Sequence, residues 1–224
     1  MANLMSTPTN FPRRINSYVP AMSYSSDVAF NGVTRVNFGA PQAPSSNNVV
    51  NAVSINAAAS IDISSIFSYL PYGRNLQVVA SIAGANTVVD VYGYDYLGQP
   101  MVERFTLNGV TPVVGNKAFY SGNVVIAAAF AGATISIGGG NKLGLPYKTL
   151  RCEWETANGL IVAAGTVQAP ALGAQSLTSL DPRGLYTSTT VHNAVNIITA
   201  AFDMVNDVDS ANNGGLHGIR HFAG

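Results

Sequence analysis

The chain has 224 residues, of which 47% are hydrophobic and only 10% are charged, with eleven basic residues balanced by eleven acidic ones. Since an ordinary soluble domain carries about 25% charged residues, neutral polar side chains or contacts between subunits must keep this protein in solution. The zero net charge offers no field to attract phosphates, which argues against direct nucleic-acid binding, and it favours self-association. This length suits a single all-β domain or two smaller domains.

The cysteine count and the apolar runs bear on the cellular compartment. Cys152 is the single cysteine, so we expect no intrachain disulfide and no thiolate zinc cluster, and we expect this side chain to be a buried or half-buried small apolar residue. Residues 1–14 lack the apolar run of a secretory signal. The longest apolar run, residues 124–137, is interrupted and falls short of the roughly 20 residues that a membrane helix needs. We expect synthesis in a reducing, soluble compartment and no membrane partner.

Residues 1–48 are predicted to form an extended N-terminal arm. Prolines at positions 8, 12, 20, 41 and 44 prevent a long helix or a central strand. Apolar and aromatic residues such as Phe11 and Tyr18 are more frequent than in a solvated disordered tail. The arm should therefore lie on its own domain or on a neighbouring subunit, with one short strand over Val33–Phe38.

Residues 49–210 are predicted to form an antiparallel β-sandwich, either immunoglobulin-like or jelly-roll-like. β-branched and aromatic runs alternate with Gly, Asn or Pro turns at short intervals, as is typical of such folds. A hairpin around Gly98 and Pro100 is the clearest of them. The expected strands in this part are Val49–Ile55, Leu76–Ile82, Thr87–Tyr94, Met101–Leu107, Lys117–Tyr120, Val124–Ala131 and Thr134–Ile137.

One short helix is predicted over Ile61–Leu70. Ile63, Phe67 and Leu70 fall at helical spacing, together with Ile66. Ser60 or Asp62 can cap its start and Pro71 can end it.

The last third of the chain is expected to be less regular. The tract Gly138–Asn141 should interrupt the sandwich pattern. Strands are expected at Thr149–Glu155, Leu160–Ala164 and Val195–Asp203. Between the last two, residues 165–194 contain few apolar residues in phase, so we predict a long projecting loop that contacts a partner. Residues 211–224 are expected to form a C-terminal tail.

Two groups of residues invite a metal-binding interpretation, and neither has the full pattern. His217 and His221 have the i, i+4 spacing of a helical metal pair, but the surrounding glycines disfavour a helix. Asp203, Asp207 and Asp209 resemble part of a calcium loop, but the further acidic ligands are missing. We expect no metal and no cofactor.

Catalytic and sugar-binding interpretations rest on the hairpin carboxylates and on the aromatic residues. Asp90, Asp95 and Glu103 flank the hairpin turn and are candidates for a paired acid and base, although the neighbouring Arg104 favours a cross-strand ion pair. The sequence has no nucleophile or phosphate-loop motif, so we do not expect an enzyme. Ten tyrosines and Trp154 could stack on sugar rings, but sheet packing is their more frequent role.

Three stretches carry a resemblance to a known family. They are Asp-Val-Tyr-Gly-Tyr-Asp-Tyr-Leu-Gly-Gln-Pro at 90–100, Gly-Asn-Lys-Leu-Gly-Leu-Pro at 140–146 and Asp-Pro-Arg-Gly-Leu-Tyr at 181–186. In these stretches the chain resembles structural proteins of tailed-bacteriophage virions, from about Asn75 to the C-terminus.

The resemblance implies a virion component made in the host cytoplasm. It would form a homo-oligomeric ring at the head–tail neck or collar by subunit packing and by exchange of the N-terminal arm between subunits. A capsid decoration (cement) protein or a tail component is the alternative, and a carbohydrate-binding module of a virion is a second one. The implied partners are further copies of the chain and virion proteins such as the portal, adaptor, tail or major capsid protein. Candidate interface residues are Phe11, Arg13, Arg14, Tyr18, Asp181, Arg183 and Tyr186.

Overall fold

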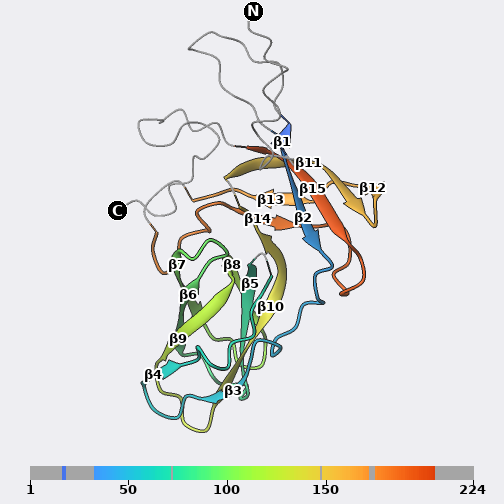
Figure 1. Ribbon diagram of the computed structural model, residues 1–224. Helices are drawn as coiled ribbons and strands as arrows, with labels where there is room; N and C mark the ends of the chain where they lie inside the picture. The colour runs from blue at the N-terminus through green and yellow to red at the C-terminus, as the bar shows by residue number, and fades with distance from the viewer. Residues whose placement is uncertain (1–16, 19–32, 72, 147, 172–174, 205–224) are drawn as a thin grey trace, which may run out of the picture.

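The computed structural model describes residues 17–18, 33–71, 73–146, 148–171 and 175–204, and these residues form strands and turns without a helix (Figure 1). The strands belong to three sheets in which every pairing is antiparallel. Sheet A has the order β1 (Ser17–Tyr18), β2 (Val33–Gly39), β15 (Ile198–Met204), β11 (Thr149–Ala157) and β12 (Leu160–Val162). Sheet B has the order β13 (Thr166–Gln168), β14 (Leu185–Thr187), β10 (Thr134–Gly144), β5 (Arg74–Ala80) and β8 (Val113–Phe119), and β3 (Val50–Ser54) also pairs with β10. Sheet C has the order β4 (Ala59–Asp62), β9 (Ser121–Ala127), β6 (Val88–Tyr94) and β7 (Pro100–Thr106).

Sheets B and C pack together as a β-sandwich, which confirms the predicted fold class. Their facing strands contribute alternate apolar side chains to one core, because successive residues of a strand point to opposite faces. In β7, for example, Met101 and Phe105 are buried while Arg104 is exposed. The predicted hairpin is β6 paired with β7, and Gly98 takes the positive φ of 78° that its turn requires.

A second core lies where sheet A meets β10 and β14. Phe38 of β2, Tyr186 of β14 and Phe202 of β15 form its centre. Tyr186 stacks on Phe38 with ring centroids 5.8 Å apart and meets Phe202 edge to face at 4.8 Å.

Strand β10 belongs to both cores. Ile135 and Ile137 near its start are buried in the sandwich core, whereas Leu143 near its end is buried in the second core. Figure 1 shows this strand curving from the sandwich toward sheet A. One continuous element thus connects the two hydrophobic clusters.

The prediction that Gly138–Asn141 interrupts the sandwich is wrong, because β10 runs through it. The glycines let another segment cross closely: a Cβ at Gly138 would lie 1.8 Å from the Ser45 carbonyl oxygen. Ser45 N–H donates to the Gly139 carbonyl, and the Asn48 side chain accepts from Gly139 N–H. The tract is therefore a packing site for residues 45–48.

The predicted helix over residues 61–70 is also wrong. Ile61 and Asp62 end β4, and only one turn follows, with a hydrogen bond from Phe67 N–H to the Ile63 carbonyl. The Asp62 carboxylate accepts hydrogen bonds from the Ser64 N–H and hydroxyl, a local side-chain contact that competes with helix formation. The buried side chains at 63, 67 and 70 were correctly identified, but a compact turn positions them.

The described residues of the 165–194 segment do not form the predicted projecting loop. They contain β13 and β14, and Leu185 and Tyr186 are completely buried. The part before β14 is anchored along the sandwich by hydrogen bonds from Arg104 N–H to the Leu177 carbonyl and from Asp181 N–H to the Asn116 carbonyl. Long-range pairing, which leaves no periodic signal in the segment itself, holds it in place.

The described part of the predicted arm belongs to the folded body. The short strand expected over Val33–Phe38 is confirmed as β2, which pairs with β15 and buries Val36 and Phe38. Residues 40–48 are also described, whereas residues 1–16 and 19–32 of the arm and the tail at 211–224 lie outside the described residues.

Candidate functional site

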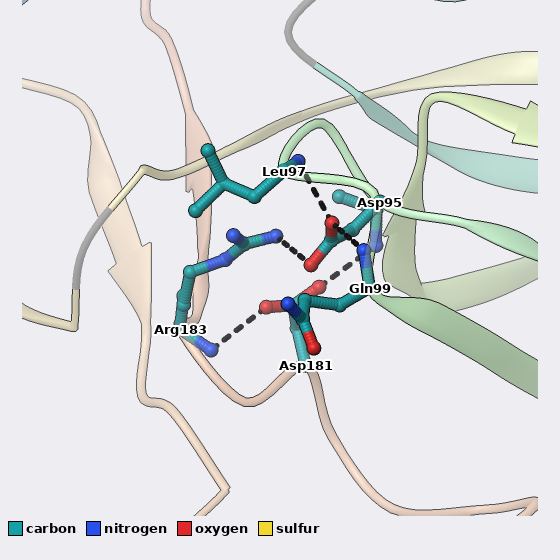
Figure 2. A network of polar contacts seen from close by, with 6 residues as sticks. Asp95, Leu97, Gln99, Asp181 and Arg183 are labelled. Carbon is teal, nitrogen blue, oxygen red and sulfur yellow. Dashed lines mark hydrogen bonds and ion pairs between the residues drawn. The ribbon is translucent and has the colours of Figure 1, made fainter. Parts of the chain in front are cut away.

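The three sequence stretches that carry the family resemblance meet in space. Strand β10 pairs with β14 through Leu143 and Tyr186, which joins the second stretch to the third. Arg183, two residues before β14, reaches the turn of the β6–β7 hairpin, in the first stretch. Its Nη2 donates a 2.6 Å hydrogen bond to Asp95 Oδ2 (Figure 2).

We call Asp95, Asp181, Arg183 and the 95–99 turn the junction. Asp95 Oδ1 accepts the N–H groups of Leu97 and Gln99, both at 2.8 Å, while its other oxygen accepts from Arg183 (Figure 2). Asp181 holds the opposite side: its Oδ1 accepts Arg183 N–H and its Oδ2 accepts Ala118 N–H of β8. One ion pair thus fixes the hairpin turn, β8 and the 181–186 segment relative to one another.

The junction is closed to solvent. The side chains of Arg183 and Asp95 are 2% and 0% exposed, and Asp181 is 1% exposed. Burial, the main influence, raises the pKa of Asp181 despite the nearby Arg183. Because a buried charge must be paired to be tolerated, this arrangement is an internal clamp. It corrects the expectation that Asp181, Arg183 and Tyr186 form an intermolecular interface, since all three side chains lie inside the chain.

A second polar cluster lies next to the junction, around Glu103 on β7. Glu103 Oε1 accepts the Asn116 backbone N–H at 2.5 Å, while its buried Oε2 has no hydrogen-bond partner within the described part of the chain. Burial raises the pKa of Glu103 to about 7. Lys117, also buried, donates its Nζ to the carbonyls of Val102 and Ser176, and burial lowers its pKa.

A third cluster surrounds Glu155 on β11. Its carboxylate accepts the Tyr186 hydroxyl, the Ser188 hydroxyl at 2.7 Å and the Thr190 N–H at 3.1 Å. Burial opposes ionisation of Glu155, but these hydrogen bonds outweigh it and lower its pKa. The half-buried Cys152 thiol lies 3.4 Å from the Tyr186 hydroxyl, and burial raises the pKa of the thiol.

A fourth buried contact joins Arg74 of β5 to His192. Arg74 Nη2 lies 3.3 Å from His192 Nδ1, and its Nη1 donates to the Gln42 carbonyl at 2.7 Å. Burial, and then the adjacent guanidinium, lower the pKa of His192 to about 4. The imidazole is therefore neutral at physiological pH and accepts from Arg74.

The hairpin carboxylates are not arranged as a facing acid and base. Asp90 pairs across the strands with Arg104 at 2.6 Å, which is the cross-strand ion pair favoured by the sequence. Glu103 is the residue before Arg104 on β7 and points to the opposite, inner face. Asp95 belongs to the junction. The three candidates thus occupy three separate environments.

The candidate metal residues are not brought together in the described part of the chain. Asp203 is in β15 and pairs with Arg151 at 3.0 Å. Asp207, Asp209, His217 and His221 lie outside the described residues, as do the interface candidates Phe11, Arg13 and Arg14. Tyr18 lies in β1. Within the described ranges no group of three or more His, Cys, Asp or Glu side chains could hold a metal ion, and no helix there could span a membrane.

Two surface features stand out from the polar interior. We call the first the β12 patch. It consists of exposed apolar side chains on the edge strand β12 and on the adjoining 191–197 loop. Two hydrogen bonds join this loop to the turn between β11 and β12: Asn158 N–H donates to the Ile197 carbonyl, and Ile197 N–H donates to Asn158 Oδ1. Its members are Leu160 (73% exposed), Ile161 (82%), Val191, Val195 and Ile197.

The second surface feature is a tyrosine cluster beside the hairpin turn. The Tyr120 ring lies 5.5 Å from Tyr69 and 6.0 Å from Tyr96 between centroids. Tyr69 is 67% and Tyr96 46% exposed. Trp154, by contrast, lies on sheet A under the Arg35 guanidinium, 5.7 Å from the ring centroid.

Sequence reasoning identified the residues of the junction but missed what they do. The signal available was an Asp-Pro-Arg-Gly sequence and an Asp at a hairpin turn in a chain with few charges. In such a chain each charged residue is a candidate for a specific partner.

Comparisons with protein-family models, curated proteins and solved structures found no match to this chain.

Proposed function

We propose that the protein is a structural component of a tailed-phage virion. It assembles as a homo-oligomeric ring at the head–tail neck or collar, through subunit packing and exchange of the N-terminal arm. The family resemblance of the three stretches, two of which meet at the junction while the remaining one pairs with β14, supports the virion assignment. The β12 patch supports the assembly, and it is the single observation on which the proposal depends most.

The β12 patch has the properties of a subunit contact. Between Glu155 and Asp203 the only Asp, Glu, Lys or Arg residues are Asp181 and Arg183, and both are buried. The neighbouring His192 is buried and neutral. Monomeric proteins protect edge strands with charges, especially lysine, because an open edge pairs with other chains. Here β12 pairs with β11 alone among the described strands and presents Leu160 and Ile161.

A second copy of the chain is the partner that this chemistry fits. An uncharged apolar patch is complementary to itself, and zero net charge removes the repulsion between identical subunits. The virion partners, namely portal, adaptor, tail or major capsid protein, would then contact the assembled ring. Capsid decoration or a place in the tail are the alternative locations.

The assembly is tested by light scattering coupled to size-exclusion chromatography. We expect the wild-type protein to form a defined oligomer and Ile161→Lys to shift it to monomer with an unchanged circular dichroism spectrum. The control variant Val110→Lys places the same charge at an exposed valine (57% exposed) that is far from the patch in sequence, and it should leave the oligomer intact. A wild-type monomer at all micromolar concentrations would contradict the proposal, and equal effects of the two lysines would exclude the β12 patch.

Arm exchange and location are tested in the particle. Removing residues 1–16, which include Phe11, Arg13 and Arg14, leaves every described strand in place. We expect the truncated protein to fold but to be missing from purified virions, and immunogold labelling of the full chain to mark the neck. Normal incorporation of the truncated protein would refute the role of the arm.

A carbohydrate-binding module is the second candidate, and the tyrosine cluster is the observation that favours it. Exposed tyrosine rings offer apolar faces and hydroxyl groups to a sugar. A glycan array probed with wild-type protein, Tyr69→Ala and Tyr96→Ala separates the two candidates. Binding that is lost in both variants supports this function, and absence of binding by the wild type excludes it for the glycans displayed.

A further inference from the structure

Lys142 on β10 and Asn116 on β8 face each other across β5. Lys142 Nζ lies 3.0 Å from Asn116 Oδ1, although β5 lies between β10 and β8 in the sheet. Both ladders of β5 shift register here, between Gly139 and Leu143 on one side and between Asn75 and Gln77 on the other. The irregularity lets the two side chains meet.

Asn75 on β5 fixes the backbones on both sides of this contact. Its Oδ1 accepts Lys142 N–H at 2.9 Å and its Nδ2 donates to the Gly115 carbonyl at 3.0 Å. A Cβ at Gly140 would lie 2.3 Å from Asn75 Oδ1, so glycine is required for this approach. The amine and the carboxamide are therefore held together by the fold, a situation that favours a reaction between them.

Burial favours the protonation states that acyl transfer from an amide to an amine requires. The amine must be neutral to act as a nucleophile, and burial lowers the pKa of Lys142. A neutral acid must be at hand to transfer protons. Glu103 accepts a hydrogen bond from the Asn116 backbone N–H, and its Oε2 is buried without a partner in the described chain. The ionised form of Glu103 raises the pKa of Lys142, so the protonated form is the one that suits the reaction.

We propose that Lys142 and Asn116 join through an intramolecular isopeptide bond. The neutral Nζ attacks Asn116 Cγ, the new Nζ–Cγ bond forms, the Cγ–Nδ2 bond breaks, and ammonia leaves. One proton passes from Nζ to the departing nitrogen, carried by the Glu103 carboxyl, which ends in its initial state. No oxidant, reductant or other co-reactant is consumed.

Gln168 is the competing acceptor, because its Oε1 also lies 2.8 Å from Lys142 Nζ. Gln168 is in the three-residue strand β13 at the edge of sheet B, and its Nε2 donates to the Asn116 carbonyl at 3.4 Å. Asn116 lies between the buried residues Gly115 and Lys117 and its backbone contacts Glu103. Asn116 is the acceptor, because Glu103 contacts this residue and, within the described part of the chain, makes no hydrogen bond with Gln168.

The bond does not depend on the proposed virion role, and intact-mass spectrometry of the purified full chain tests it. We expect a mass about 17 Da below that of the sequence, corresponding to lost ammonia, and a branched tryptic peptide linking residues 116 and 142. Lys142→Arg and Asn116→Ala should have the full mass expected of their sequences. Gln168→Ala is the matched control and should keep the loss.

Two outcomes overturn the proposal. One is a wild-type chain that keeps its full mass after native incubation at pH 7–8. The other is a mass loss that persists in Asn116→Ala, which would place the bond elsewhere. Glu103→Gln should fold, as judged by circular dichroism, and lack the bond, and bond formation at the wild-type rate in this variant would refute the role of Glu103.

Discussion

Breaking the buried ion pair of the junction should destabilise the protein far more than breaking an exposed pair of the same geometry. Asp95→Asn keeps one oxygen for the Leu97 and Gln99 N–H groups but presents an NH₂ group to Arg183. Arg183 Nη2 then joins Nε and Nη1, which already have no partner in the described part of the chain. An uncompensated buried guanidinium costs about 3–5 kcal/mol, a large share of the 5–15 kcal/mol of a typical domain.

The matched control is Asp90→Asn. Asp90 and Arg104 are also 2.6 Å apart, but the Arg104 side chain is 42% exposed and water can solvate it once its partner is removed. We therefore expect a clearly smaller loss. Urea unfolding at pH 7, followed by Trp154 fluorescence and circular dichroism, measures both values.

A double variant separates the charge effect from the turn. Asp95→Asn combined with Arg183→Met removes both partners, and replacing a buried pair by apolar groups of similar volume is often nearly neutral. Part of the stability lost in Asp95→Asn should return. A loss in Asp95→Asn no greater than in Asp90→Asn, or a double variant less stable than the single one, would refute the reasoning.

Three further predictions concern the interior. The pKa of Glu103 is about 7 in the folded chain against 4.5 for a free side chain. Because the unfolded state releases its proton first, the free energy of unfolding of the wild type should fall by about 3 kcal/mol as the pH rises from 4.5 to above 7. Urea titrations of Glu103→Gln should lack this slope, and an unchanged slope would contradict the assignment. Gly138→Ala should cost about 1–3 kcal/mol through its contact with the Ser45 carbonyl, seen as a lower melting temperature, whereas a neutral effect would mean that the crossing is loose. Tyr186→Phe should cost about 2 kcal/mol by removing a hydrogen bond to the Glu155 carboxylate, and no change in urea midpoint would show that this contact does not stabilise the fold.

The sandwich was predictable because its strands carry a local signal. In β6 and β7, β-branched and aromatic residues flank a turn that contains Gly98, and side chains alternate between faces. Such a pattern indicates both the element and its pairing partner, since the two strands are adjacent in sequence.

The elements that escaped prediction depend on distant parts of the chain. Strand β14 buries Leu185 and Tyr186 in succession because β10 and β13 flank it on both edges. No alternation is visible in three residues. In the same way, Gly138 is in a strand because Ser45, almost a hundred residues earlier, crosses it.

The junction shows the same limit for the candidate site. Arg183 and its partner Asp95 are 88 positions apart. In a chain with few charges, an Arg in a Pro-Gly context suggests a surface contact, and nothing in the local sequence distinguishes a buried partner from a neighbouring subunit. For Leu160 and Ile161 the sequence predicts a strand, but it does not indicate that this strand lies at the edge of its sheet.

The shared strand β10 has a consequence for how the molecule opens. Its first residues are held by β3 and β5 and its last by β14, so neither core can be released without removing a strand from the other. We expect the two cores to melt in one cooperative transition and the amides of β10 to exchange with solvent only through global unfolding. A load applied to one end of the molecule is thereby shared by all of it.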